Sequence, residues 1–175
     1  MAESAVFDES FDRWVSDHVE VLYRVAFRLL GNRHDAEDIV QDAFRSAWTS
    51  RHLFDRTRSE RAWLLGILRR RVADHWRRSH TRLPGGDGVP ADGVAPPDRD
   101  PFADELSSAM QRALARLPVE LRETLLLVVV GGLTHQEAAD VLGVPLGTVL
   151  SRVSRARSRL REYLLEATTS LPMRS

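Results

Sequence analysis

A pair of short helical segments joined by a tight turn, Gly132 to Arg161, constrains the fold of this chain more than any other stretch. Thr134 and Glu137 stand three residues apart, the spacing of a capping box in which each side chain bonds a backbone donor at a helix start. Gly143 has the place of a C-cap glycine, and Pro145 is expected at the first position of the next helix. The pattern predicts a helix-turn-helix, a motif that reads duplex DNA.

The second helix of this pair is amphipathic and basic. Its apolar stripe, expected to pack on the preceding helix, contains Leu146, Val149, Val153, Ala156 and Leu160. Arginines and small hydroxyl residues lie elsewhere on the helix, where an arginine can grip guanine O6 and N7 and its neighbours can reach phosphates. The predicted contacts with duplex DNA are Thr148, Ser151, Arg152, Ser154, Arg155, Arg157 and Arg159. The alternative is a solvated amphipathic helix whose arginines only keep it soluble.

Composition narrows the remaining possibilities. The 175 residues carry zero net charge but segregate it, because Asp35 to Asp42 holds four acids and no base while residues 61–82 hold seven arginines and one acid. The absence of cysteine excludes disulfides, cysteine zinc sites and thiol redox sensing by this chain. The longest apolar run, Leu125 to Val130, is far too short to span a bilayer, and the acidic N-terminal stretch does not resemble a signal peptide. We therefore expect a cytoplasmic protein without membrane insertion.

The chain divides into two helical halves around a segment rich in Pro, Gly and Asp, Thr81 to Pro101, which has too few large apolar side chains to order itself. The expected division is a first domain over 8–80, a flexible linker over 81–102 and a second domain over 103–165. No strand-like alternation is present, so the expected fold class is all-α.

Helical spacing predicts the elements of both halves. In the first half it favours a helix from Phe11 that ends at Gly31-Asn32, a second from Asp35 to Thr49, and a third from Glu60 to Arg78. The second of these is expected to bury Ala36, Val40, Ala43, Phe44 and Ala47. Downstream of the linker, two helices from Ala103 to Leu117 and from Glu120 to Val130, separated at Pro118, precede the helix-turn-helix.

Three stretches together resemble a known family. They are LLGNRHDAEDIVQDAFRSAW and WLLGILRRRVADHWRR in the first half, and LPVELRETLLL with GLTHQEAADVLGVPLGTVLSRVSRAR in the second. In order, spacing and total length they are similar to the bacterial RNA polymerase sigma factors of the extracytoplasmic-function (ECF) type, which have only conserved regions 2 and 4. The resemblance covers about residues 8 to 165.

The resemblance implies a role for each half. The second domain would read the minus-35 duplex of a promoter, while the first would bind core RNA polymerase and open the minus-10 element as single strand. The implied polymerase contacts are Asp38, Gln41, Asp42 and Arg45. The implied contacts with the minus-10 strand are Arg56, Arg58, Arg69, Arg70, Arg71, Arg77 and Arg78. An anti-sigma factor is the expected regulator, and no cofactor, metal or small-molecule substrate is expected.

Some residues leave alternatives open. Trp63 and Trp76 could stack on bases, but Trp63 lies on the inward stripe of its helix, which favours core packing, whereas Trp76 fits either role. Arg70 stands where the family usually has Asn, and Leu150 and Ser154 replace a basic and a larger residue of the recognition helix. These departures leave the promoter sequence undetermined.

Two other classes of protein fit parts of the sequence. A stand-alone repressor or activator would use the helix-turn-helix without polymerase, but it would need neither the acidic helix nor the arginine-rich helix of the first half. A metal-dependent hydrolase could be suspected from His34-Asp35 with Glu37 and Asp38. Further ligands on other helices do not stand out, and residues 35, 37 and 38 do not share one helix face.

Overall fold

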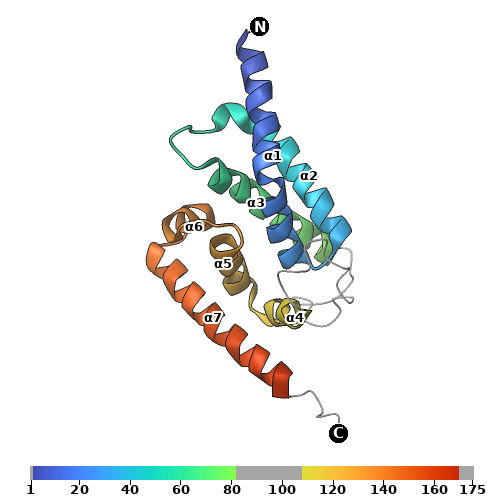
Figure 1. Cartoon of the computed structure of the whole chain (residues 1–175), viewed down its shortest axis with the longest axis vertical. Helices are drawn as coiled ribbons and strands as arrows, with labels where there is room; N and C mark the ends of the chain where they lie inside the picture. Colours follow the sequence, from blue (N-terminus) through green and yellow to red (C-terminus); the bar gives the residue numbers. More distant parts are fainter. Residues whose placement is uncertain (1, 82–107, 170–175) are drawn as a thin grey trace.

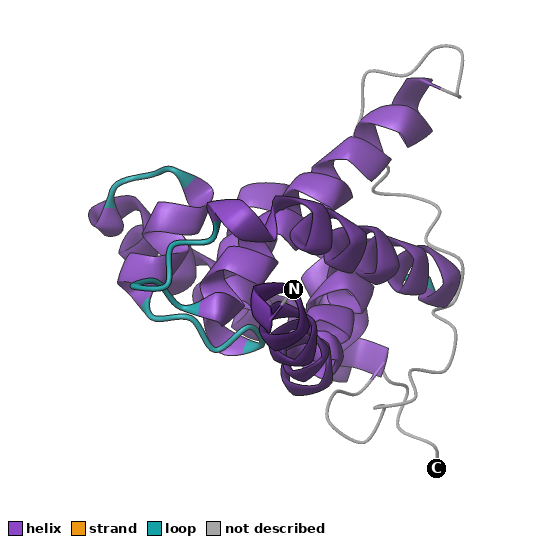
Figure 2. Cartoon of the chain, turned by 90° about the horizontal axis from the view of Figure 1, so that it is seen from above, coloured by secondary structure: helices purple, strands orange, loops and turns teal. Residues whose placement is uncertain are grey.

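The computed structural model describes residues 2–81 and 108–169, and within these ranges it consists of seven α-helices, one short 3-10 turn and no strand (Figures 1 and 2). The elements of the first half are α1 (Ala2–Leu30), α2 (Arg33–Ser50), the 3-10 turn η1 (Arg51–Leu53) and α3 (Glu60–Thr81). Those of the second half are α4 (Ser108–Arg116), α5 (Val119–Val129), α6 (His135–Leu142) and α7 (Leu146–Thr169). The expected all-α fold class is confirmed.

The first half is a three-helix bundle in which α1, α2 and α3 each contact the other two. Gly31, with φ of 72°, lets the chain turn between α1 and α2, and the Asn32 side chain accepts a hydrogen bond from the backbone N–H of Asp35 at 3.1 Å to cap α2. The residues expected on the buried face of α2 are all buried, and Ile39 joins them. Leu64, Leu65 and Leu68 of α3 complete this core.

In the second half, α7 packs against α4, α5 and α6, so the long C-terminal helix forms one wall of this unit (Figure 1). Its buried side chains are Val149, Val153, Ala156 and Leu160. They meet an apolar layer from α5 that includes the fully covered Leu126 and Leu127. The apolar stripe of the sequence therefore serves mainly as the core of this half.

The two halves also pack against each other, because α1 contacts α4 and α5 while α3 contacts α6. A buried hydrogen bond joins them, in which Arg28 of α1 donates to Oε1 of Gln111 of α4 at 3.0 Å. The expected linker over 81–102 lies outside the described residues, apart from Thr81, which ends α3. The helix expected from Ala103 is described from Ser108 onward.

Two details at the start of α7 differ from expectation. Leu146 was expected on the buried stripe but is 40% exposed at the first position of α7. Pro145 precedes the helix as its N-cap residue and does not occupy its first turn, since its carbonyl accepts the first helical bond from the N–H of Thr148 at 2.9 Å. Among the described residues, no helix has the combination of length and apolar character needed to cross a membrane.

Candidate nucleic-acid interface

The helix-turn-helix has the local geometry that its sequence predicts. The Thr134 hydroxyl accepts a hydrogen bond from the N–H of Glu137 at 3.2 Å, and the Glu137 carboxylate accepts one from the N–H of Thr134 at 2.8 Å. Gly143 adopts the left-handed conformation, with φ of 66°, that ends α6 and turns the chain toward α7. The capping box and the C-cap glycine are thus both confirmed, and together they fix the angle at which α7 leaves the turn.

The predicted minus-35 residues lie along α7 in two environments. Ser154, Arg155, Arg157 and Arg159 are exposed, whereas Thr148, Ser151 and Arg152 are half-buried. The Arg155 guanidinium donates a hydrogen bond to Ser151 Oγ at 3.0 Å, and this hydroxyl donates to the Thr148 carbonyl at 3.0 Å. This chain of bonds holds the Arg155 side chain along the helix surface.

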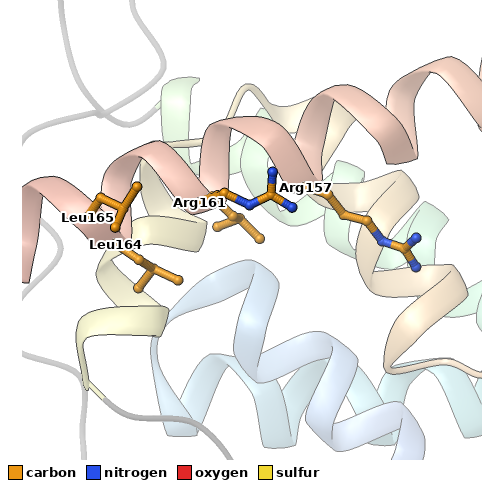
Figure 3. Close-up of a pocket in the computed structure, with 5 residues that line it drawn as sticks. Arg157, Arg161, Leu164 and Leu165 are labelled. Atoms are coloured by element: carbon orange, nitrogen blue, oxygen red, sulfur yellow. The ribbon is translucent and has the colours of Figure 1, made fainter.

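Two apolar side chains near the start of α7 are exposed, Leu146 of the expected apolar stripe and Leu150 of the expected recognition helix. Leu146 and Leu150 are 40% and 49% exposed and stand beside the arginines near the start of the helix. Leucine side chains here can contact a thymine methyl group. Farther along α7, an open groove is lined by Arg157, Leu160, Arg161, Leu164 and Leu165. Figure 3 shows the side chains of Arg157, Arg161, Leu164 and Leu165 along this part of the helix.

The loop between η1 and α3 is ordered by a short turn around Asp55. The Thr57 hydroxyl and backbone N–H both donate to Asp55 Oδ1, at 2.7 and 2.9 Å, and these bonds lower the pKa of the Asp55 carboxyl. Arg58 pairs with the same carboxylate at 3.7 Å yet stays largely exposed, and Arg56 is exposed at the loop tip. Both predicted loop arginines therefore reach solvent from a preformed turn.

Beneath this loop lies a cluster of aromatic rings. Trp63 packs between Trp14 and Phe54, with ring centroids 5.7 and 5.1 Å away, and is partly buried against the core. Its packing supports the expected core role over a stacking platform. Trp48 is the more exposed tryptophan of the cluster, and the Arg51 guanidinium lies over its ring at 3.9 Å.

The structure divides the arginines of α3 between two faces. Arg70 and Arg71 line a groove between α2 and α3, where Arg71 Nε donates to Ser46 Oγ at 2.9 Å. Arg77 pairs with Asp74 and is exposed together with Arg78. Arg69 instead points toward the second half of the chain, where its Nε lies 2.7 Å from Oε1 of Glu123 in α5. The seven residues predicted for the minus-10 strand therefore do not form one continuous surface.

Glu123 is a buried acid near the candidate interface, and the pKa of its carboxyl departs from the ordinary value. It is 8% exposed, and burial raises the pKa of its carboxyl, an effect that the positive charges of Arg69 and Arg152 only partly offset. Arg69 belongs to the predicted minus-10 set and Arg152 to the predicted minus-35 set. Sequence analysis did not single out Glu123, because nothing in its local pattern distinguishes it from a solvated helix acid.

The predicted polymerase-binding residues lie on the outer face of α2. Asp38, Gln41 and Arg45 are exposed, and Asp42 is half-buried with its carboxylate 2.7 Å from the Arg45 guanidinium. The opposite face of α2 is fixed in the core. This surface is therefore held rigidly by the bundle and carries closely spaced polar and charged groups. Among the described residues, no group of three or more histidine or acidic side chains is placed to hold a metal ion.

Each half of the chain matches a known family model. The family model described as Sigma-70 region 2 matches residues 14–82, and the one described as Sigma-70, region 4 matches residues 107–160. Together the matches cover well over half of the chain. They include α2 and α3 in the first half and the helix-turn-helix in the second.

Individual relatives agree with these matches. The ECF RNA polymerase sigma factor SigE of Mycolicibacterium smegmatis is 36% identical over 92% of this chain and 67% of its own length. The ECF RNA polymerase sigma factor SigW of Bacillus subtilis is 32% identical over 89% of each chain. The solved structure of the sigma factor RpoE with the anti-sigma factor NepR from Bartonella quintana matches 89% of this chain and 97% of that chain, with a TM-score of 0.79 and 30% identity.

Proposed function

Since this chain belongs to the ECF RNA polymerase sigma factors, which are transcription initiation factors and not enzymes, we propose how its residues divide the task of initiation. The proposed units are the domain over 8–80, the linker over 81–102 and the domain over 103–165. In the last of these, α7 enters the major groove of the minus-35 duplex. Arg155 and the small residues beside it face the bases, while Arg157 and Arg159 contact phosphates.

The outer face of α2 is the proposed docking surface for core RNA polymerase. Asp38, Gln41, Asp42 and Arg45 lie together on a helix that the bundle holds rigidly. Charged groups on such a surface orient the partner and speed encounter more than they add net affinity. We therefore assign to this face the orientation of the chain on polymerase.

The arginines of α3 and of the loop before it are the proposed contacts with the opened minus-10 strand. Arg56 and Arg58 reach solvent from the ordered loop, and Arg70, Arg71, Arg77 and Arg78 line or flank the outer part of α3. Phosphates of a single strand attract such a row of guanidinium groups, and opened bases can be held in a loop. Arg69 joins this set only when it is released from Glu123.

Regulation by an anti-sigma factor is also proposed. The similar RpoE from Bartonella quintana was solved with its anti-sigma factor NepR, and the similarity extends over both halves of the present chain. The place of action is the cytoplasm, where core RNA polymerase and promoter DNA are found.

One observation supports the proposal most strongly: two different surfaces occur in one chain. The first is a capped helix-turn-helix with exposed arginines, and the second is the charged outer face of α2, which lies opposite its buried face. Run-off transcription with purified core polymerase on genomic promoter fragments tests it. Transcripts should start only when this protein is added. If no transcript starts while the protein alone binds duplex DNA tightly, a repressor or activator is the correct function.

The docking role of α2 can be tested separately by a charge reversal. Asp38→Arg should slow association with core polymerase at low salt, because an exposed charge acts mainly on the encounter rate. Glu162→Arg, which reverses an exposed acid on α7, is the matched control and should leave that rate unchanged. Equal effects of the two variants would remove the α2 face from the docking surface.

A further inference from the structure

Two leucines near the start of α7 form an apolar strip on a basic surface. Leu146 and Leu150 are 40% and 49% exposed and lie one turn apart on the same row of the helix. In the part of the chain that the structure describes, neither belongs to the hydrophobic core or to the side chains packed against it. The other exposed residues over 146–161 are glycine, serine and arginine. Packing within the chain therefore does not explain why this strip is apolar.

The strip runs beside the row of α7 that is proposed to face the bases. That row contains Gly147, Ser151 and Arg155, and it lies next to the leucine row around the helix. The Arg155 guanidinium donates to Ser151 Oγ at 3.0 Å, so its charged end lies at the level of Leu150. An apolar side chain and a guanidinium thus occur side by side at one level of the helix.

Gly147 leaves the surface one turn before Leu150 without a side chain. A Cβ built on this glycine would meet nothing within 4 Å, and its φ is negative, so neither packing nor backbone conformation requires a glycine here. Glycine also lowers helix stability relative to alanine. Its advantage is therefore external to the chain. Without a side chain at Gly147, the helix can approach the floor of a groove closely enough for the short side chain of Leu150 to touch a base.

The group that an exposed leucine can recognise in the major groove is a methyl group on C5 of a pyrimidine. The other groups that distinguish the base pairs there are hydrogen-bond donors and acceptors, which leucine cannot satisfy. Thymine carries this methyl group, and 5-methylcytosine carries the same group at the same position. Cytosine and uracil lack it. A leucine in the groove therefore favours a C5-methylated pyrimidine.

We propose that Leu150, with Leu146 one turn before it, reads the C5-methyl group of a pyrimidine beside the guanine contacted by Arg155. This inference rests on the proposed function, since it takes α7 as the helix that enters the minus-35 duplex. The segment from Ser151 to Arg161 carries five arginines and no acid, so charge holds the helix in the groove while the leucine adds sequence preference. Thymine is the expected base, and 5-methylcytosine is its expected substitute.

Deoxyuridine removes the methyl group of thymine and keeps its hydrogen bonds. Holoenzyme made from the full chain and core polymerase first selects minus-35 sequences from a random duplex pool. Each thymine of the selected element, on either strand, is then replaced by deoxyuridine. One replacement should weaken binding in competition about fourfold, which corresponds to about 0.8 kcal/mol for one buried carbon group. Leu150→Ala should bind the thymine and deoxyuridine duplexes equally at that position.

A second pair of duplexes tests the other source of the methyl group. Cytosine and 5-methylcytosine, each paired with guanine, are placed at the position that responds to deoxyuridine. The parent chain should bind 5-methylcytosine about fourfold more tightly than cytosine, for the same reason as above, and Leu150→Ala should bind them equally. Discrimination between thymine and deoxyuridine without discrimination in this second pair would contradict direct contact with the methyl group.

Two further variants separate the role of Leu150 from a general effect of surface leucines. Leu165→Ala is the matched control, because it truncates an exposed leucine at the far end of the same helix. It should keep the parent preference for thymine over deoxyuridine. Leu150→Arg should lose that preference and favour guanine, since a guanidinium can bind O6 and N7. Circular dichroism verifies that all variants are folded.

Three results would overturn the proposal: a selected minus-35 element without thymine, equal binding of thymine and deoxyuridine at every position, and a thymine preference that persists in Leu150→Ala. Failure of the proposed function is a separate result, in which the holoenzyme selects no element and starts no transcript. The same duplex series is then measured on sites selected by the chain alone. A methyl preference that Leu150→Ala removes there retains the reading role of Leu150, and equal binding rejects it.

Discussion

Under the proposed function, Arg155 is the side chain expected to read a base of the minus-35 element. Its guanidinium is exposed and held by Ser151 on the face of α7 that points away from the core. Arg155→Ala should lose about 1–3 kcal/mol of discrimination at one base pair of the minus-35 element, because a bidentate contact with guanine is removed. Competition binding of holoenzyme to promoters that differ at single positions measures this loss.

Arg159→Ala is the control for that experiment. Arg159 flanks the base-facing side of α7, so its loss should weaken binding to all sequences alike and reduce the salt dependence. If Arg155→Ala instead weakens every sequence equally, Arg155 is a phosphate contact and the base-reading role belongs to another residue.

The stability of the folded chain should depend on pH through Glu123. Burial raises the pKa of its carboxyl, so the folded chain retains a proton that the unfolded chain releases near pH 4.3, the ordinary value for glutamate. The contribution of Glu123 to stability is therefore fully present below that pH and is lost as pH rises through the raised pKa. Glu123→Gln should flatten this fall in the free energy of unfolding, measured by denaturant titration at a series of pH values.

An exposed acid on α7 provides the comparison. Glu162→Gln removes a carboxyl without removing a buried charge, so its curve should keep the slope of the parent chain. A Glu123→Gln curve parallel to that of the parent would mean that this carboxyl does not change its pKa on folding.

At the scale of the element, the helix-turn-helix was the part best predicted from sequence. Its capping box and C-cap glycine depend on bonds within a few residues, so local spacing was sufficient to place them. The exposure of Leu146 could not be predicted in the same way. Helical periodicity gives the direction of a side chain, whereas its burial depends on how far the partner helices extend.

Thr134 should contribute measurably to the stability of this element. Thr134→Ala removes the hydroxyl that caps α6 and should cost about 1 kcal/mol in the free energy of unfolding. Thr134→Ser keeps a hydroxyl at the same place and should cost much less. Denaturant unfolding of the three proteins measures both effects, and equal losses for the two variants would show that the cap does not stabilise α6.

At the scale of the whole molecule, sequence predicted the helical content, the order of the helices and the family. It did not predict how the halves meet, because this contact joins residues far apart in the chain, and local spacing does not indicate which of them pack together. Arg69 illustrates the difficulty. Within a run of three arginines it looks like its neighbours, yet the helical twist directs it to Glu123 while Arg70 and Arg71 line the groove beside α2.

The most direct test of the account is permanganate footprinting of a promoter with core polymerase, with this chain, and with both, because permanganate oxidises thymines that have left the duplex stack. Reactive thymines should appear in the minus-10 element only when both proteins are present, and Arg70→Ala/Arg71→Ala should reduce their reactivity while minus-35 protection persists. Protection of a duplex site by this chain alone, with no reactive thymine in the presence of polymerase, would contradict the assignment of promoter opening to its first half.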